Sequence, residues 1–128
     1  MKRGVLDTSV FVARESGRPL VVAQIPERVA VSVITLAELQ LGVLAAPSAA
    51  IRRRRLATYR DALQFDPIPI DTAVGDEWAE LRSTLGAAGK SLTSNDLWIA
   101  ATARHLKVPI VTQNREMTRI PGVQAILV

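Results

Sequence analysis

The sequence predicts one α/β domain over residues 1–128, with a short parallel central sheet and helices on both of its faces. Short β-branched runs alternate with longer segments of helical periodicity, and this alternation is typical of parallel sheets. The 128 residues suit one domain with a real core, and no linker, repeat or low-complexity segment divides them. Hydrophobic residues make up 48% of the chain and charged residues 22%, which are ordinary values for a globular protein.

The expected elements follow from apolar patterns and from the residues that begin and end helices. Strands are expected at residues 4–6, 29–33, 68–70, 108–112 and 123–127. Helices are expected after the turn at residues 7–9, at 36–46 before Pro47, from a Ser48 cap to about 65, from an Asp71 cap to Gly86, and at 96–105. The side chains expected to be buried in the second and third long helices are Ile51, Leu56, Tyr59 and Leu63, and then Val74, Trp78, Leu81 and Leu85.

Several function classes lack the residues they need. The absence of cysteine excludes a disulfide scaffold, a thiolate zinc site and a cysteine nucleophile. His105 is the only histidine, so a metal-free ribonuclease with two histidines is poorly supplied, and neither a G-x-S-x-G elbow nor a Gly-rich phosphate loop is present. No signal peptide or membrane-spanning run is recognisable, and we expect a cytoplasmic protein that does not contact a membrane.

Three acids stand in unusually apolar surroundings. Asp7 follows the first strand, and Glu38 and Asp96 lie near the starts of predicted helices whose neighbouring residues are almost all apolar. Each acid also has a structural interpretation: residues 35–38 and 93–96 match capping boxes, and Asp7 can cap the helix that follows it. Inward-facing carboxylates, however, cost several kcal/mol unless something compensates their charge.

A divalent cation would supply that compensation. Ligands of α/β sheets bind beyond the carboxyl ends of the strands, where we expect Asp7 and Thr112 to lie. Hard oxygen ligands suit Mg²⁺ or Mn²⁺, and such ions assist phosphodiester hydrolysis by activating water and stabilising the leaving oxygen. The residues therefore predict a metal-dependent nuclease with Asp7, Glu38 and Asp96 at its centre.

Four stretches in this order resemble the PIN-domain family, in particular the VapC toxins of bacterial VapBC toxin–antitoxin pairs. The stretches are VLDTSV at residues 5–10, TLAELQLG at 35–42, NDLWIAATA at 95–103 and PIVTQN at 109–114. The resemblance covers essentially the whole chain. It implies that Asp7, Glu38 and Asp96 bind Mg²⁺ or Mn²⁺, that the chain is an endoribonuclease, and that a cognate antitoxin inhibits it.

The chain departs from this family at the fourth acidic position. Many relatives carry an aspartate shortly after the final threonine, where this chain has Asn114, and Glu116 is the remaining carboxylate. We predict Asn114 as a supporting or substrate-binding group and Glu116 as an outer ligand; a solvated loop acid is the alternative for Glu116. The hydroxyls of Thr8, Ser9 and Thr112 are expected to orient the acids or the waters of the metal.

The net charge of +4 favours a polyanionic partner. We expect RNA backbone contacts from some of Arg52, Arg55, Lys90 and Arg115, although runs such as residues 52–55 are more often simply solvated. The segment 36–65 is richer in apolar residues than one buried face requires. The resemblance implies two uses for such a surface, an antitoxin segment and a toxin homodimer.

Two other functions remain open from the sequence. A receiver-like signalling domain would use Asp71 as phosphoacceptor, but Asp7 has no acidic neighbour and no lysine follows Lys107. A catalytically silent RNA-binding regulator is the second alternative, which Asn114 leaves open.

Overall fold

The computed structural model describes residues 2–128 and contains one five-stranded sheet. Its strands are, in chain order, β1 (Arg3–Leu6), β2 (Arg28–Ser32), β3 (Pro67–Ile68), β4 (Ile110–Thr112) and β5 (Ala125–Leu127). They lie in the order β3-β2-β1-β4-β5, and every neighbouring pair is parallel. The carboxyl ends of the strands therefore share one edge of the sheet, and the central strand β1 ends there directly before Asp7.

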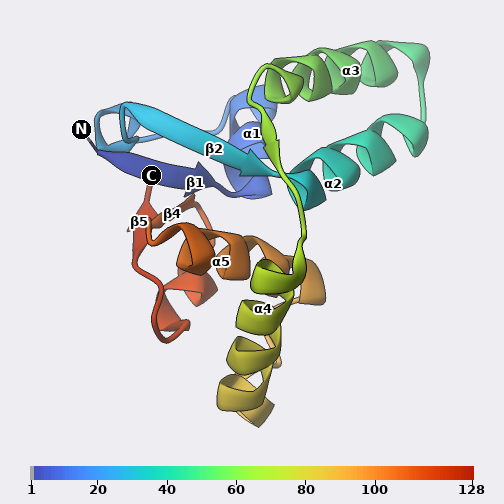
Figure 1. The fold of residues 1–128 in the computed structure, drawn as a ribbon. Coiled ribbons are helices and arrows are strands. Elements are labelled where there is room, and N and C mark those ends of the chain that lie inside the picture. The colour runs from blue at the N-terminus through green and yellow to red at the C-terminus, as the bar shows by residue number, and fades with distance from the viewer. Residues whose placement is uncertain (1) are drawn as a thin grey trace.

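Five α-helices connect or follow the strands. They are α1 (Thr8–Ser16), α2 (Val33–Leu44), α3 (Ala49–Leu63), α4 (Thr72–Leu85) and α5 (Ser94–Leu106). Short 3₁₀ turns occupy Val22–Gln24, Gly86–Gly89 and Arg115–Arg119. The α2–α3 hairpin extends beyond the sheet, and α4 and α5 form a second pair of helices in the lower part of Figure 1. Among residues 2–128, no helix has the length and apolar character needed to cross a membrane.

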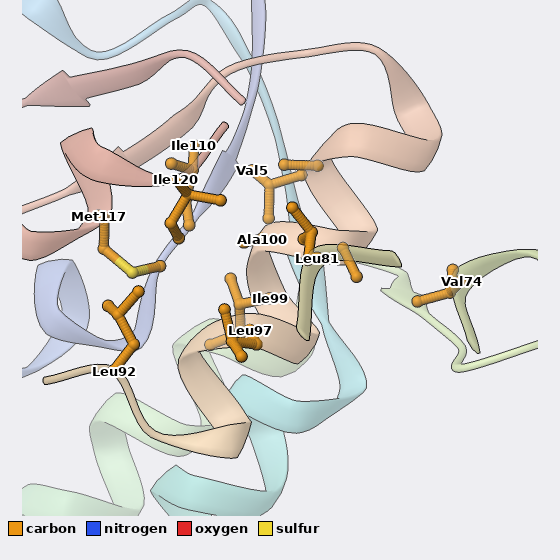
Figure 2. Close-up of a cluster of buried hydrophobic side chains, with 12 residues drawn as sticks. Val5, Val74, Leu81, Leu92, Leu97, Ile99, Ala100, Ile110, Met117 and Ile120 are labelled. Atoms are coloured by element: carbon orange, nitrogen blue, oxygen red, sulfur yellow. The ribbon is translucent and has the colours of Figure 1, made fainter. Parts of the chain in front are cut away.

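The sheet is covered on both faces, as the sequence predicts. Successive side chains of a strand point to opposite faces. Val5 of β1 belongs to a buried cluster with residues of α4 and α5, which Figure 2 shows in close-up. Leu6, the next residue, belongs to a second cluster with residues of α1, α2 and α3. The two clusters hold the carboxyl edge of the sheet between two layers of helices.

The predicted caps of two helices are confirmed, but the start of α2 differs. Ser48 accepts a hydrogen bond from the Ile51 amide (3.2 Å), and Asp71 accepts one from the Val74 amide (2.9 Å). Helix α2 begins at Val33, with the Ser32 side chain as its cap. The capping box predicted at residues 35–38 is therefore wrong, because β2 runs into the helix without the intervening turn that would place a cap at residue 35.

The buried side of α3 also differs by one residue from the prediction. Leu63 is 46% exposed, whereas its neighbour Ala62 is fully buried. Ala62 packs in the cluster that includes Phe11 and Leu36, and Tyr59, three residues earlier, lies partly buried against the same cluster. The helix thus turns a small side chain toward its neighbours, which allows close packing, and leaves Leu63 facing outward.

The cap of α4 provides a test of the fold. Replacing Asp71 with Ala removes the acceptor for the Val74 amide, so we expect a loss of about 0.5–2 kcal/mol in the free energy of unfolding, measured by urea denaturation. Asp76→Ala is the matched control, because Asp76 is an exposed acid of the same helix. Equal losses for the two variants would contradict the capping role of Asp71.

Candidate metal centre

Asp7 is a buried carboxylate at the carboxyl end of the central strand. Its exposed fraction is 3%. Ser9 Oγ donates to its Oδ2 at 2.7 Å, and Thr112 Oγ1, at the end of the neighbouring strand β4, donates to the same oxygen at 2.8 Å. Asp7 occupies the N-cap position of α1, but its side chain makes no capping hydrogen bond. The interpretation of this carboxylate as a helix cap is therefore wrong, and the side chain faces the next strand.

The two hydroxyls are themselves oriented by backbone amides. The Gln113 amide donates to Ser9 Oγ (3.0 Å), and the Asn114 amide donates to Thr112 Oγ1 (2.9 Å). Each hydroxyl thus accepts from the backbone and directs its own proton to Asp7. The predicted role of Ser9 and Thr112 in orienting an acid matches this geometry.

The Asp7 carboxyl has no basic partner among the described residues, since no Lys, Arg or His side chain there forms an ion pair with it. Burial raises the pKa of the Asp7 carboxyl, the Ser9 and Thr112 hydroxyls lower that pKa, and the negative charge of Asp96 raises it; the net pKa lies above the ordinary value. The ionised form is therefore unfavourable in this fold unless a cation compensates it.

Asp96 caps its own helix and also acts on Asp7. Its Oδ2 accepts from the Thr93 amide (2.9 Å), while Thr93 Oγ1 accepts from the Asp96 amide (3.0 Å). This confirms the capping box predicted at residues 93–96. The box engages Oδ2, and no described side chain or backbone amide donates to Oδ1. Capping and ligation are therefore compatible in this residue.

Glu38 is joined to the segment after Asp7 through a threonine. Thr8 Oγ1 donates to Glu38 Oε1 at 2.7 Å and lies 2.9 Å from Thr35 Oγ1. Thr35 is fully buried, and its part in this cluster was missed from the sequence. Its position three residues before Glu38, on the same side of a helix, is the signal that would have placed the two side chains together.

The predicted ligands Asp7, Glu38 and Asp96 are related in pairs and do not form one tight cluster. The charges of Asp7 and Asp96 interact, and Glu38 is connected through Thr8. Within residues 2–128, no three His, Cys, Asp or Glu side chains lie close enough to hold one ion together. Mg²⁺ uses one or two carboxylates and retains several waters, and the interacting carboxylates of Asp7 and Asp96 have the chemistry that such an ion binds. The buried, unpaired carboxylate of Asp7 is the observation that supports this fit.

Asn114 and Glu116 lie in the segment after β4. Asn114 Oδ1 accepts from the Glu116 amide (3.0 Å) and so caps the 3₁₀ turn Arg115–Arg119. Glu116 Oε2 accepts from Ser91 Oγ (2.8 Å) and lies 3.2 Å from Arg119 Nη1. These partners give Asn114 a local structural role and tie Glu116 to the loop before α5.

The predicted basic residues divide into two kinds. Arg55 Nη1 donates to the Gly42 carbonyl at 2.7 Å, so this guanidinium ties α3 to the end of α2. Arg52, Lys90 and Arg115 are exposed, and none forms an ion pair with a described acid. The structure thus gives Arg55 a contact within the protein and leaves the other three facing solvent.

Comparison with known proteins identifies the family of this chain. A family model described as the PIN domain matches residues 4–123. The chain belongs to the PIN-domain family. Ribonuclease VapC5 of Mycobacterium tuberculosis, a curated relative, is 46% identical over 123 residues, which cover 96% of this chain and 91% of the relative. Ribonuclease VapC4 of the same organism is 42% identical over 133 residues, which cover 100% of this chain and 98% of that protein.

Solved structures agree with the PIN-domain fold. A member of the VapBC family of toxin–antitoxin systems, VapBC-5 from M. tuberculosis, matches with a TM-score of 0.89 and 42% identity, covering 100% of both chains. VapBC2 from Rickettsia felis, bound to a promoter DNA fragment, matches with a TM-score of 0.79 and 26% identity over 97% of both chains. The receiver-like interpretation finds no support, since Asp71 serves as the cap of α4.

The raised pKa of Asp7 predicts that Asp7→Asn stabilises the protein in EDTA at neutral pH. A raised folded pKa contributes stability that is complete below the unfolded value of about 3.9 and is lost as the pH rises through the folded value. Asparagine stays neutral throughout, and its Oδ1 can still accept from Ser9 and Thr112. We expect the variant to melt above wild type at pH 7, with the difference shrinking toward pH 4, in thermal denaturation followed by circular dichroism.

Two controls accompany this measurement. Asp76→Asn removes one exposed negative charge and should show no comparable pH dependence. Mn²⁺ should stabilise wild type and narrow its gap to Asp7→Asn. If Asp7→Asn melts below wild type at pH 7 in EDTA, the ionised carboxylate does not destabilise the folded protein and the prediction is wrong.

Proposed function

We propose that this chain is a metal-dependent endoribonuclease of the VapC type, the toxin of a type II toxin–antitoxin pair. Relatives that match nearly its whole length are named ribonuclease VapC. The observation that carries the proposal is the buried Asp7 carboxylate, which has hydroxyl donors, a second acid nearby and no basic partner. A site that holds unneutralised carboxylates in this way is built to receive a cation.

We assign Asp7 and Asp96 as the ligands of Mg²⁺ or Mn²⁺, with Glu38 beside them. When bound, the ion supplies Lewis acidity at the scissile phosphate and a nucleophilic water. Ser9 and Thr112 fix Oδ2 of Asp7. Thr93 fixes Oδ2 of Asp96 and leaves Oδ1 for ligation. Glu116, already bound to Ser91 and Arg119, is at most an outer group.

One carboxylate oxygen of Glu38, Oε2, is available for proton transfer. Thr8 fixes its Oε1, and no described group donates to its Oε2. We assign this oxygen to accept a proton from the attacking water, while the leaving oxygen takes a proton from solvent as its bond to phosphorus breaks. The same arrangement would allow Glu38 to contact the ion through a water, which a direct two-carboxylate site leaves room for.

The proposed substrate is RNA, held through its backbone. The exposed Arg52, Lys90 and Arg115 are available for phosphate, and a net charge of +4 favours a polyanion. Asn114 is a further candidate for substrate contact. Arg55 is the weakest of the predicted phosphate contacts, because the Gly42 carbonyl already occupies its guanidinium.

The proposed protein partners are a cognate antitoxin and a second copy of the chain. Structural relatives are VapBC toxin–antitoxin complexes. The α2–α3 hairpin exposes Leu41 (66%), Leu44 (68%) and Leu63 (46%), which supports a partner on this hairpin. A cytoplasmic location belongs to the same proposal, since RNA and an antitoxin are found there.

Metal-dependent cleavage tests the proposal directly. We expect purified protein to cut a mixed single-stranded RNA pool with Mg²⁺ or Mn²⁺ and to lose the activity in EDTA. Asp7→Asn and Asp96→Asn should each reduce the cleavage rate about 100-fold or more, because each removes several kcal/mol of transition-state stabilisation. Product ends are read by sequencing, which also separates endonucleolytic from exonucleolytic cleavage.

Asp76→Asn, an exposed acid of α4, controls for a simple loss of charge and should cleave like wild type. Cleavage that survives both EDTA and Asp7→Asn would remove the metal from the mechanism. RNA binding without cleavage under any metal would favour the catalytically silent regulator instead.

A further inference from the structure

A cavity adjoins the acidic site on the side of Glu38. It has a volume of about 270 Å³ and lies between α1, α2 and α3. Thr8 and Glu38 form the wall that it shares with the acidic site, and their hydrogen bond of 2.7 Å lies in that wall. The remaining wall comes from Val12 and Glu15 of α1, Leu39 and Gly42 of α2, and Arg55 of α3.

The polar side chains of this cavity are the carboxylates of Glu15 and Glu38, the Thr8 hydroxyl and the Arg55 guanidinium, and the rest of its lining is apolar. One N–H group of the Arg55 guanidinium donates to the Gly42 carbonyl at 2.7 Å. Glu15 is half-buried, and no described residue hydrogen-bonds or ion-pairs with its carboxylate. Glu38 has one oxygen free of such partners. Two carboxylates against one guanidinium leave the lining with a negative charge, which disfavours a phosphate, so the matching ligand is a neutral group with N–H donors on its edge.

We propose that this cavity is a subsite for one unpaired nucleobase of the substrate, with a preference for guanine. Guanine presents two adjacent N–H donors, which match the two oxygens of one carboxylate. The volume is slightly below the roughly 300 Å³ at which sites for whole small molecules begin, and so suits one ring system. The inference rests on the proposed function, because the base belongs to the RNA whose phosphate lies at Asp7.

Gly42 offers a way to fill the cavity without unfolding the protein. A Cβ at this position would meet only Arg55 Cδ, at 3.9 Å, which is ordinary van der Waals contact. Gly75 of α4 is a matched control, because a Cβ there meets nothing within 4 Å and the residue does not line the cavity. Both glycines lie inside helices, so an alanine at either position favours the helix for the same reason.

Cleavage of an unpaired RNA pool with randomised positions tests the subsite. With wild type and Mn²⁺, we expect guanine to be enriched at one fixed position relative to the cut. Gly42→Leu should lower kcat/KM for guanine at that position about tenfold and flatten the base profile, because the leucine side chain would occupy the space of the base; a tenfold change corresponds to about 1.4 kcal/mol. Gly42→Ala should have an intermediate effect, Glu15→Gln should weaken the guanine preference, and Gly75→Ala should keep the wild-type profile.

Binding without catalysis gives a second measurement. Guanosine should shift the Gly42 amide resonance of wild type more than adenosine does, and it should not do so in Gly42→Leu if that variant has wild-type circular dichroism. If argininamide shifts this resonance and guanosine does not, the cavity takes a cationic protein side chain and the inference is wrong. A base profile identical in wild type and Gly42→Leu also overturns it, while leaving the ribonuclease proposal intact. Wild type that cuts no RNA with any metal overturns both.

Discussion

The burial of one carboxylate, Asp7, is the constraint on which the functional edge of this protein depends. The parallel pairing of β1 with β4 sets Asp7 beside Thr112 at the end of the neighbouring strand. The backbone after β4 then supplies two amides, of Gln113 and Asn114, which orient the hydroxyls of Ser9 and Thr112 toward Asp7. The topology of the sheet therefore determines where the Asp7 carboxyl lies. Its burial there raises its pKa, so the fold alone does not stabilise the ionised form.

Caps and ligands are not exclusive roles for an acid at a helix start. Asp96 completes the capping box of α5 through one oxygen, which fixes its rotamer next to the positive end of the helix dipole. Because the rotamer is fixed, the direction of the second oxygen, Oδ1, is fixed as well. A side chain already fixed by a cap loses little entropy when it binds an ion, so the structural role of Asp96 is compatible with the ligand role proposed for it.

The sequence predicted the alternating elements, the two-sided covering of the sheet and the edge at which Asp7 and Thr112 meet, because these depend on apolar periodicity and on general rules for parallel sheets. It placed the start of α2 at the wrong residue, since Ser32 and Thr35 are both good caps and only the end of β2 decides between them. The partner of Glu116 could not be predicted either, because Ser91 lies 25 residues away on a different loop. Contacts between loops depend on packing that no local pattern records.

The donors around Asp7 are neutral hydroxyls, and this distinguishes its surroundings from a structural ion pair. An arginine or lysine in place of Ser9 or Thr112 would stabilise the same carboxylate, but it would also cancel the charge that a cation needs. Neutral hydroxyls fix the oxygen without supplying a positive charge, so they do not cancel the charge of the ionised carboxylate. Elsewhere in the same fold, Glu77 and Glu80 are paired with Arg104 at 2.9 Å each, which shows that this chain neutralises acids with arginine where only stability is required. The lack of such a partner for Asp7 among the described residues is what the proposed cation site requires.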